Sequence, residues 1–261
     1  MIRSALVYGL LLTLVSSCSR YAIGSEKPQP PAEFLSQQLL ERQKAGQGVA
    51  DIIDRLATLN PSALRAELNT KEKQLAFWIN TYNGMVQYWL AERPDLWENR
   101  GRFFSGKRIT IAGELVSLEN IEHGVIRGTE AKLGLGFVPK FFPSKFEQTF
   151  KIKKGDPRIH FALNCGAISC PPVEIYRAET VNERLDHRSR VYLERNTTLS
   201  ADGRTVTTTP LFKWFKGDFN AYGGINDFLV HFGILSEENK RVKRAYTSYD
   251  WTLALDVWAT D

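Results

Sequence analysis

The chain has 261 residues, of which 43% are hydrophobic and 24% are charged, and its formal net charge is +5. This composition supports a sizeable folded core. The basic residues cluster only at positions 151–154 and 240–244, without the interleaved aromatic side chains of a nucleic-acid surface. We therefore expect no nucleic-acid partner.

Residues 1–17 are typical of the signal peptide of a bacterial lipoprotein. Arg3 supplies a positive charge, and the apolar run 5–14 is shorter than the roughly 20 residues that a membrane-spanning helix needs. The sequence of residues 14–18, Leu-Val-Ser-Ser-Cys, is typical of a lipobox, in which Cys18 becomes a lipidated N-terminus. An ordinary cleaved signal peptide with a chance cysteine is the alternative. We expect an anchor in the bacterial cell envelope, at the outer membrane and facing the periplasm.

Residues 18–32 are polar and contain three prolines, a composition that buries too little apolar surface to become ordered. We expect a flexible tether there. Residues 33–261 are then expected to form a single α+β domain. Helices come first and strands later, which favours N-terminal helices packed on a mostly antiparallel sheet over a repeating β-α-β arrangement.

The first part of this domain has the apolar spacing of helices. The sequence predicts helices over 33–46, 50–59 and 70–90, and a further helix that begins at Pro61. Residues 103–118 are expected to be extended instead. Within them, a hairpin is predicted to turn near Ala112 and Gly113.

The second part alternates between short elements and loops. A helix is expected to open at 117–121, and the Gly-, Pro- and Phe-rich segment 134–150 is expected to be a loop, with 137–146 as a candidate lid. The remaining predictions are strands over 158–163, 204–209 and 247–258, helices over 178–195 and 226–232, and an aromatic corner over 211–219.

The segment 156–172 contains the most informative chemistry of the chain. His160 lies five residues before Cys165, at the end of an apolar run, and Gly166 follows the cysteine. A thiol and an imidazole are the components of cysteine-nucleophile catalysis, and a glycine turn presents backbone N–H groups of the kind that an oxyanion requires. Whether His160 and Cys165 share a face depends on the turn after Leu163.

A disulfide is the alternative use of the same cysteines. If Cys18 is lipidated, Cys165 and Cys170 remain, and an even number of cysteines in an oxidising compartment allows a bridge. His160 would then be a core residue. A third hypothesis joins the two, because Cys170 could cap Cys165 until the bridge is reduced. The spacing alone leaves these alternatives open.

Further polar candidates lie on two predicted helices. Arg127 follows His123 by four residues and shares its helix face more closely than that of Glu122. Glu122 either orients a distant imidazole or is a buried carboxylate that braces a loop or pairs with an arginine. Asn80 and Asn83 lie three residues apart in an apolar helix, where buried amides must be hydrogen-bonded, so they either lock neighbouring loops or line a site.

No cofactor or metal is expected. The Cys-x4-Cys spacing differs from the Cys-x2-Cys of structural zinc sites. The sequence also lacks a phosphate loop, a dinucleotide fingerprint and a Gly-x-Ser-x-Gly nucleophile elbow.

Several segments resemble the domain-of-unknown-function family 547, namely 77–83 (FWINTYN), 118–127 (LENIEHGVIR), 156–166 (DPRIHFALNCG), 169–171 (SCP) and 249–251 (YDW). The resemblance covers roughly residue 74 to the C-terminus. It implies a distant relation to papain-like cysteine hydrolases, in which a glutamate, a histidine and a cysteine act together. The matching catalytic residues here are Glu122, His160 and Cys165, with supporting positions at Asn80, Asn83, His123, Arg127, Asn164 and Gly166. The position of His123 is expected to tolerate asparagine.

The sequence therefore predicts a membrane-tethered cysteine hydrolase, similar to a thiol protease or amidase, or an acyltransferase. Its substrate would be a peptide, an amide or an acyl compound. Cys165 would attack a carbonyl, His160 would accept the thiol proton, and Glu122 would fix the orientation of the imidazole. The alternative is a non-catalytic binding lipoprotein with a permanent Cys165–Cys170 disulfide.

Overall fold

The computed structural model describes residues 30–260 of the protein. The expected signal peptide, Cys18 and nearly all of the expected tether lie outside the described residues. The end of the tether segment is described, and there Ala32 begins helix α1 and is buried. Helix α1 therefore begins inside the segment for which a flexible tether was predicted.

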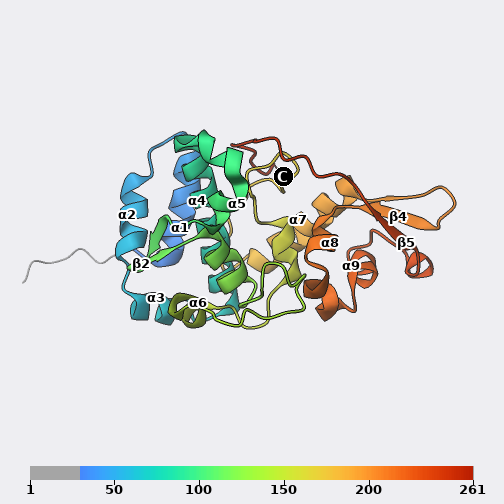
Figure 1. Ribbon diagram of the computed structural model, residues 1–261, viewed down its shortest axis with the longest axis horizontal. Helices are drawn as coiled ribbons and strands as arrows, with labels where there is room; N and C mark the ends of the chain where they lie inside the picture. The colour runs from blue at the N-terminus through green and yellow to red at the C-terminus, as the bar shows by residue number, and fades with distance from the viewer. Residues whose placement is uncertain (1–29, 261) are drawn as a thin grey trace, which may run out of the picture.

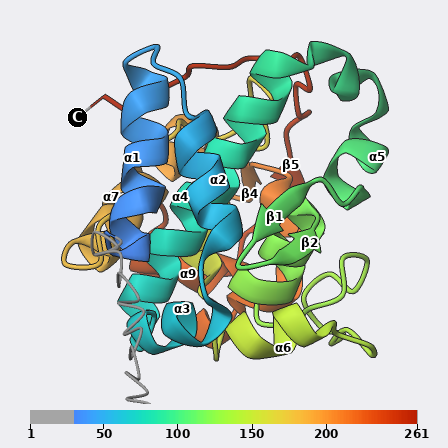
Figure 2. The ribbon, with the colours of Figure 1, turned by 90° about the vertical axis from the view of Figure 1, so that its left-hand side faces the viewer.

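The N-terminal half is built around one long buried helix, α4 (Lys71–Glu92). The Thr70 side chain caps this helix by accepting a hydrogen bond of 3.3 Å from the Lys73 N–H. Helix α1 (Ala32–Lys44) packs along α4, and α2 (Ala50–Thr58) and α3 (Pro61–Glu67) complete this half (Figure 2). All four helices confirm the sequence-based predictions.

A short hairpin lies next to these helices. Strands β1 (Ile109–Ile111) and β2 (Glu114–Val116) pair antiparallel. They turn at Ala112 and Gly113, both with positive φ, as two-residue hairpin turns require. The hairpin prediction is confirmed.

The extended start that was predicted at Phe103 is wrong. Residues Arg100–Ser105 form helix α5, which follows the 3₁₀ helix η1 (Pro94–Asn99). Asn99 accepts a hydrogen bond of 3.1 Å from the Arg102 N–H and so caps the helix.

The C-terminal half has its own hydrophobic cluster, rich in phenylalanine, and lies at the other end of the molecule from α2 and α3 (Figure 1). Its elements are α7 (Val181–Asn196), β3 (Thr198–Leu199), β4 (Thr205–Thr208), α8 (Leu211–Trp214), η4 (Lys216–Tyr222), α9 (Ile225–His231), η5 (Glu237–Asn239) and β5 (Lys243–Tyr246). Its three strands form one sheet, in which β3 pairs antiparallel with β4 and β5 pairs parallel with β4.

The α+β class is confirmed, but the predicted packing of helices on one sheet is only partly right. The described residues form two small separate sheets, and the long helices α1 and α4 pack mainly on each other. Among the described residues, every helix is too short or too polar to cross a bilayer.

The segment 158–163 was predicted as a strand, but residues 158–161 belong to the 3₁₀ helix η3 (Pro157–Phe161) and the rest is irregular. Asp156 accepts a hydrogen bond of 3.2 Å from the Arg158 N–H, and the fixed φ of Pro157 suits the first helical position. Ile159, His160 and Phe161 are all buried, so their apparent alternation did not reflect a sheet face.

Three further segments differ from expectation. The last strand was predicted over 247–258, but β5 ends at Tyr246, and this tail makes only isolated bridges through Leu253 and Trp258. The loop predicted over 134–150 ends in helix α6 (Lys145–Phe150), which begins with a capping box of Ser144 and Glu147. The helix predicted to open at 117–121 is the π-helix η2 (Asn120–Ile126).

Candidate active site

A cavity of about 350 Å³ takes its lining from both halves of the molecule. The side chains that line it are Tyr82, Phe104, Glu119, Glu122, His123, Lys132, Leu133, Leu135, His160, Leu163, Cys165, Pro171, Leu211, Trp214, Phe215, Tyr249 and Trp251. The structure thus brings the three predicted catalytic residues to one cavity, although they come from distant parts of the sequence. Its volume and largely apolar lining are typical of small-molecule sites.

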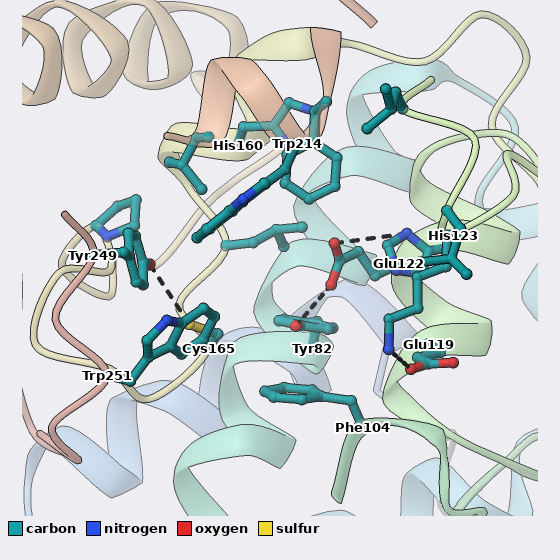
Figure 3. Close-up of a pocket in the computed structure, with 17 residues that line it drawn as sticks. Tyr82, Phe104, Glu119, Glu122, His123, His160, Cys165, Trp214, Tyr249 and Trp251 are labelled. Atoms are coloured by element: carbon teal, nitrogen blue, oxygen red, sulfur yellow. Dashed lines mark hydrogen bonds and ion pairs between the residues drawn. The ribbon is translucent and has the colours of Figure 1, made fainter. Parts of the chain in front are cut away.

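Cys165 and Cys170 form a disulfide at one side of this cavity, as the alternative reading of the two cysteines predicted. Cys165 is partly exposed and lines the cavity, whereas Cys170 is buried behind it. The Cys170 sulfur accepts hydrogen bonds from the Cys165 N–H (3.0 Å) and from the Tyr249 hydroxyl (3.2 Å). The Tyr249 hydroxyl also lies 3.7 Å from the Cys165 sulfur (Figure 3).

The turn after the cysteine depends on Gly166 and Asn164. Gly166 has φ +93°, a backbone conformation that strains any residue with a side chain. A Cβ there would also lie 2.7 Å from Leu90 Cδ1 and clash with it. The Gly166 N–H donates to Asn164 Oδ1 at 2.9 Å. This N–H is therefore already engaged, and the expectation that it would be available to an oxyanion is not met in the oxidised protein.

His160 is held by a carboxylate that the sequence analysis did not single out. Its Nε2 lies 2.8 Å from Asp218 Oδ2 and donates to it, and its ring stacks on Phe215 with centroids 4.0 Å apart. Burial lowers the pKa of His160, although the bond to Asp218 and its charge oppose this shift. The ring is therefore neutral near pH 7, with its lone pair on Nδ1.

Asp218 also binds Arg127 through two hydrogen bonds, of 2.7 Å to Nε and 2.8 Å to Nη2. Burial alone would raise the pKa of Asp218, but the bonds to His160 and Arg127 hold it well below its usual range. The close approach of the loop above it requires Gly136, because a Cβ there would lie 2.0 Å from Asp218 Oδ1. Asp218 is thus a fixed, charged anchor beneath the imidazole.

Glu122 does not hold His160, in contrast to the role expected for it. Its Oε2 accepts a hydrogen bond of 2.9 Å from the Tyr82 hydroxyl, and its Oε1 lies 3.7 Å from His123 Nδ1. Figure 3 shows this group across the cavity from Cys165. Burial, together with Glu122, raises the pKa of Tyr82, so the hydroxyl stays protonated and donates.

His123 and Arg127 are partners, as their spacing on one helix face predicted. Arg127 Nη1 donates to His123 Nδ1 at 2.9 Å, and η2 positions both residues. Burial lowers the pKa of His123, which keeps its ring neutral beside the guanidinium. The cavity is therefore bordered by a continuous polar network that runs from His160 through Asp218 to His123.

Asn80 and Asn83 lock loops and do not line the cavity. Asn80 exchanges two hydrogen bonds with the backbone of Tyr176, of 2.8 and 2.9 Å. Asn83 donates to the Ala162 carbonyl (2.9 Å) and accepts from the Asn164 N–H (2.8 Å). Helix α4 thereby fixes the backbone that carries Cys165.

The sequence analysis did not single out a group of packed aromatic residues in the site, Trp214, Tyr249 and Trp251. Trp251 stacks on Trp214 with centroids 5.7 Å apart and contacts Tyr249 at 4.7 Å. Tyr249 and Trp251 belong to the Tyr-Asp-Trp segment near the C-terminus, which carried part of the family resemblance and was the only available signal. Within residues 30–260, no three His, Cys, Asp or Glu side chains come together as a metal-binding group.

Residues 66–193 match the family described as "Protein of unknown function, DUF547", so the chain carries a DUF547 domain over this range. The range includes Glu122, His160 and Cys165, whereas Asp218 and Tyr249 lie beyond it. No curated protein and no solved structure gives a match to the chain.

Proposed function

We propose that this DUF547 domain belongs to a cysteine hydrolase or acyltransferase with a distant papain-like relation, and that Cys165 is its nucleophile. The observation that carries the proposal is the shared cavity. A partly exposed cysteine and a neutral imidazole held by a carboxylate both line it. Asp218 takes the orienting role for which Glu122 was the sequence-based candidate.

The oxidised site is a resting form in this proposal. The disulfide holds the Cys165 sulfur against Cys170, and no hydrogen bond joins Cys165 to His160 among the described residues. An external dithiol would reduce the bridge by supplying two electrons and two protons, which gives two thiols and an oxidised dithiol. The Cys165 side chain could then rotate toward the cavity, and its N–H, now bound to Cys170, would become available to a carbonyl oxygen.

In the reduced site, His160 Nδ1 accepts the thiol proton as Cys165 attacks the carbonyl carbon of the substrate. The Asp218 carboxylate stabilises the imidazolium that forms. When the tetrahedral intermediate collapses, His160 returns the proton to the leaving group, and a thioester to Cys165 remains. Water, or an acceptor amine or alcohol, then releases the acyl group. The apolar lining favours a substrate with a hydrophobic acyl or side-chain part.

Alkylation of the full chain tests the proposal. We would treat the protein with a dithiol, remove it, add iodoacetamide across a pH series, and identify labelled cysteines by mass spectrometry. An ordinary cysteine thiol has a pKa of about 8.5. We expect Cys165 to react rapidly at a pH well below this value, and His160→Ala to slow the reaction. The exposed His231 gives a matched control, because His231→Ala should leave the rate unchanged. A Cys165 that reacts no faster than an ordinary thiol would refute the proposal.

A non-catalytic binding protein is the second candidate, favoured by the disulfide and by the engaged Gly166 N–H. In that case the bridge is permanent, and the aromatic cavity holds a ligand. Cys165→Ala and Cys170→Ala should then lower the free energy of unfolding equally, whereas the enzyme proposal predicts that Cys165→Ala alone abolishes thiol reactivity in the reduced protein.

We also propose that the protein is a lipoprotein of the bacterial envelope, anchored through Cys18. The support is the lipobox-like sequence at residues 14–18. Mass spectrometry of the mature N-terminus tests it. A lipid-modified Cys18 at the N-terminus is the expected result, and an unmodified Cys18 or cleavage elsewhere would contradict it.

A further inference from the structure

We propose that residues 131–142, the apolar loop, dock on the surface of an anionic lipid bilayer. Twelve large hydrophobic side chains are exposed among the described residues, and half of them belong to this loop: Leu133, Leu135, Phe137, Val138, Phe141 and Phe142. Leu133 is 89% exposed, Phe141 80% and Phe142 91%. A concentration of exposed apolar side chains in one short loop is typical of an interaction site.

Backbone hydrogen bonds hold the apolar loop in place, both within the loop and to η4. The Ala131 N–H donates to the Val138 carbonyl at 2.8 Å, and the Gly217 N–H donates to the Leu135 carbonyl at 2.6 Å. Gly136 meets Asp218 so closely that the loop has no room to move inward. Figure 2 shows the chain next to α6 protruding beyond the helices around it.

The charge around the apolar loop identifies a lipid surface rather than a protein partner of unspecified chemistry. Residues 131–155 contain six lysines and a single acidic residue, Glu147, which is buried. Lys132 and Lys140 are already paired, with Glu119 and Glu147. The remaining four lysines are exposed, and none of them forms a salt bridge with another described residue: Lys145, Lys151, Lys153 and Lys154. An exposed apolar loop that is followed in the sequence by four lysines without an ion pair in the described part of the chain matches the chemistry of an anionic bilayer interface.

Docking would also connect the bilayer to the cavity. Leu133 and Leu135 line the cavity from the same loop that carries Phe141 and Phe142 on its outside. A lipid-borne apolar molecule would therefore enter beside these leucines without crossing water. This inference is independent of the thiol chemistry, because it depends only on the loop and its lysines.

Hydrogen exchange on the full chain tests the proposal, because it reports on the loop peptides separately. The result therefore does not depend on whether the N-terminus itself binds the vesicles. We would compare vesicles of phosphatidylcholine with vesicles that also contain phosphatidylglycerol, and read the peptides that cover 131–142. Slower exchange of these peptides on the anionic vesicles alone is the expected result. Equal exchange on both, or protection that appears without vesicles as the protein concentration rises, would overturn it, the latter by identifying a second copy as the occupant.

Two sets of variants sharpen the experiment. The double variant Phe141→Ser/Phe142→Ser and the triple variant Lys145→Gln/Lys151→Gln/Lys153→Gln should each lose the protection. The matched control Leu115→Ser/Leu199→Ser removes exposed leucines from β2 and β3 and should retain it. Full protection in the double variant would overturn the proposal.

Discussion

Replacing Asp218 with asparagine should destabilise the protein more than any exposed charge change. The carboxylate receives three hydrogen bonds of 2.7–2.8 Å from Arg127 and His160, and the Arg127 side chain is only 1% exposed. The Asp218→Asn variant leaves this guanidinium buried without its counter-charge. Removing one partner of a buried ion pair typically costs about 3–5 kcal/mol, and we expect a loss of about 3 kcal/mol because asparagine retains one acceptor.

Urea denaturation of the full chain at pH 7, followed by tryptophan fluorescence, measures this loss. The pair Arg93–Asp95 provides a matched control, because it has the same two-bond geometry, at 2.7 and 2.8 Å, on the exposed surface. Asp95→Asn should change the unfolding midpoint little. A midpoint change for Asp218→Asn no larger than for Asp95→Asn would refute the reasoning.

The same substitution should alter the acid sensitivity of the fold. The folded-state pKa of Asp218 lies below its unfolded value, which is about 3.9 for aspartate. The unfolded chain therefore binds the proton first as the pH falls. The stabilisation is present above about pH 4 and is lost below it, so the wild-type protein should lose more stability than Asp218→Asn between pH 6 and pH 3. Parallel losses in the two proteins would contradict this assignment.

Three more predictions concern the frame around the site. Asn83→Ala should lower the free energy of unfolding by about 2–4 kcal/mol in urea denaturation, because two buried backbone groups lose their partner. Gly124→Ala should cost about 1–3 kcal/mol in the same assay, since its Cβ would lie 2.3 Å from Glu147 Oε1; an unchanged midpoint would contradict this contact. Thr70→Ala should cost about 1 kcal/mol by removing the cap of α4, and Thr70→Ser should restore most of it.

The helical half of the fold could be predicted because its signals are local. Helix α4 has both an apolar run and the capping Thr70, and the β1–β2 turn has Gly113 where positive φ is needed. The strand prediction for the segment that contains His160 was wrong, because burial on all sides removes the hydrophobic periodicity that distinguishes a strand from a helix.

The candidate site could be predicted only in part for a related reason. Cys165 and His160 lie close in sequence, so their motif identified them. Asp218 lies 58 residues beyond His160, and only the packing of η4 against η3 brings the two side chains into contact. Glu122 was the nearest carboxylate with a motif around it, and the fold directs it to Tyr82 instead.

The Asn164 side chain bears on the reduction of the Cys165–Cys170 bridge that the proposed function requires. It accepts from the Gly166 N–H and donates to the Pro171 carbonyl, both at 2.8–2.9 Å, and so joins the two ends of the same short loop that the sulfurs join. The frame of the loop is closed by amides, which are indifferent to redox conditions. We therefore expect reduction of the bridge, which the proposed function requires, to release two side chains while the Asn164 hydrogen bonds hold the peptide around them in place. The proposed enzyme could then pass repeatedly between a sealed and a reactive surface without unfolding.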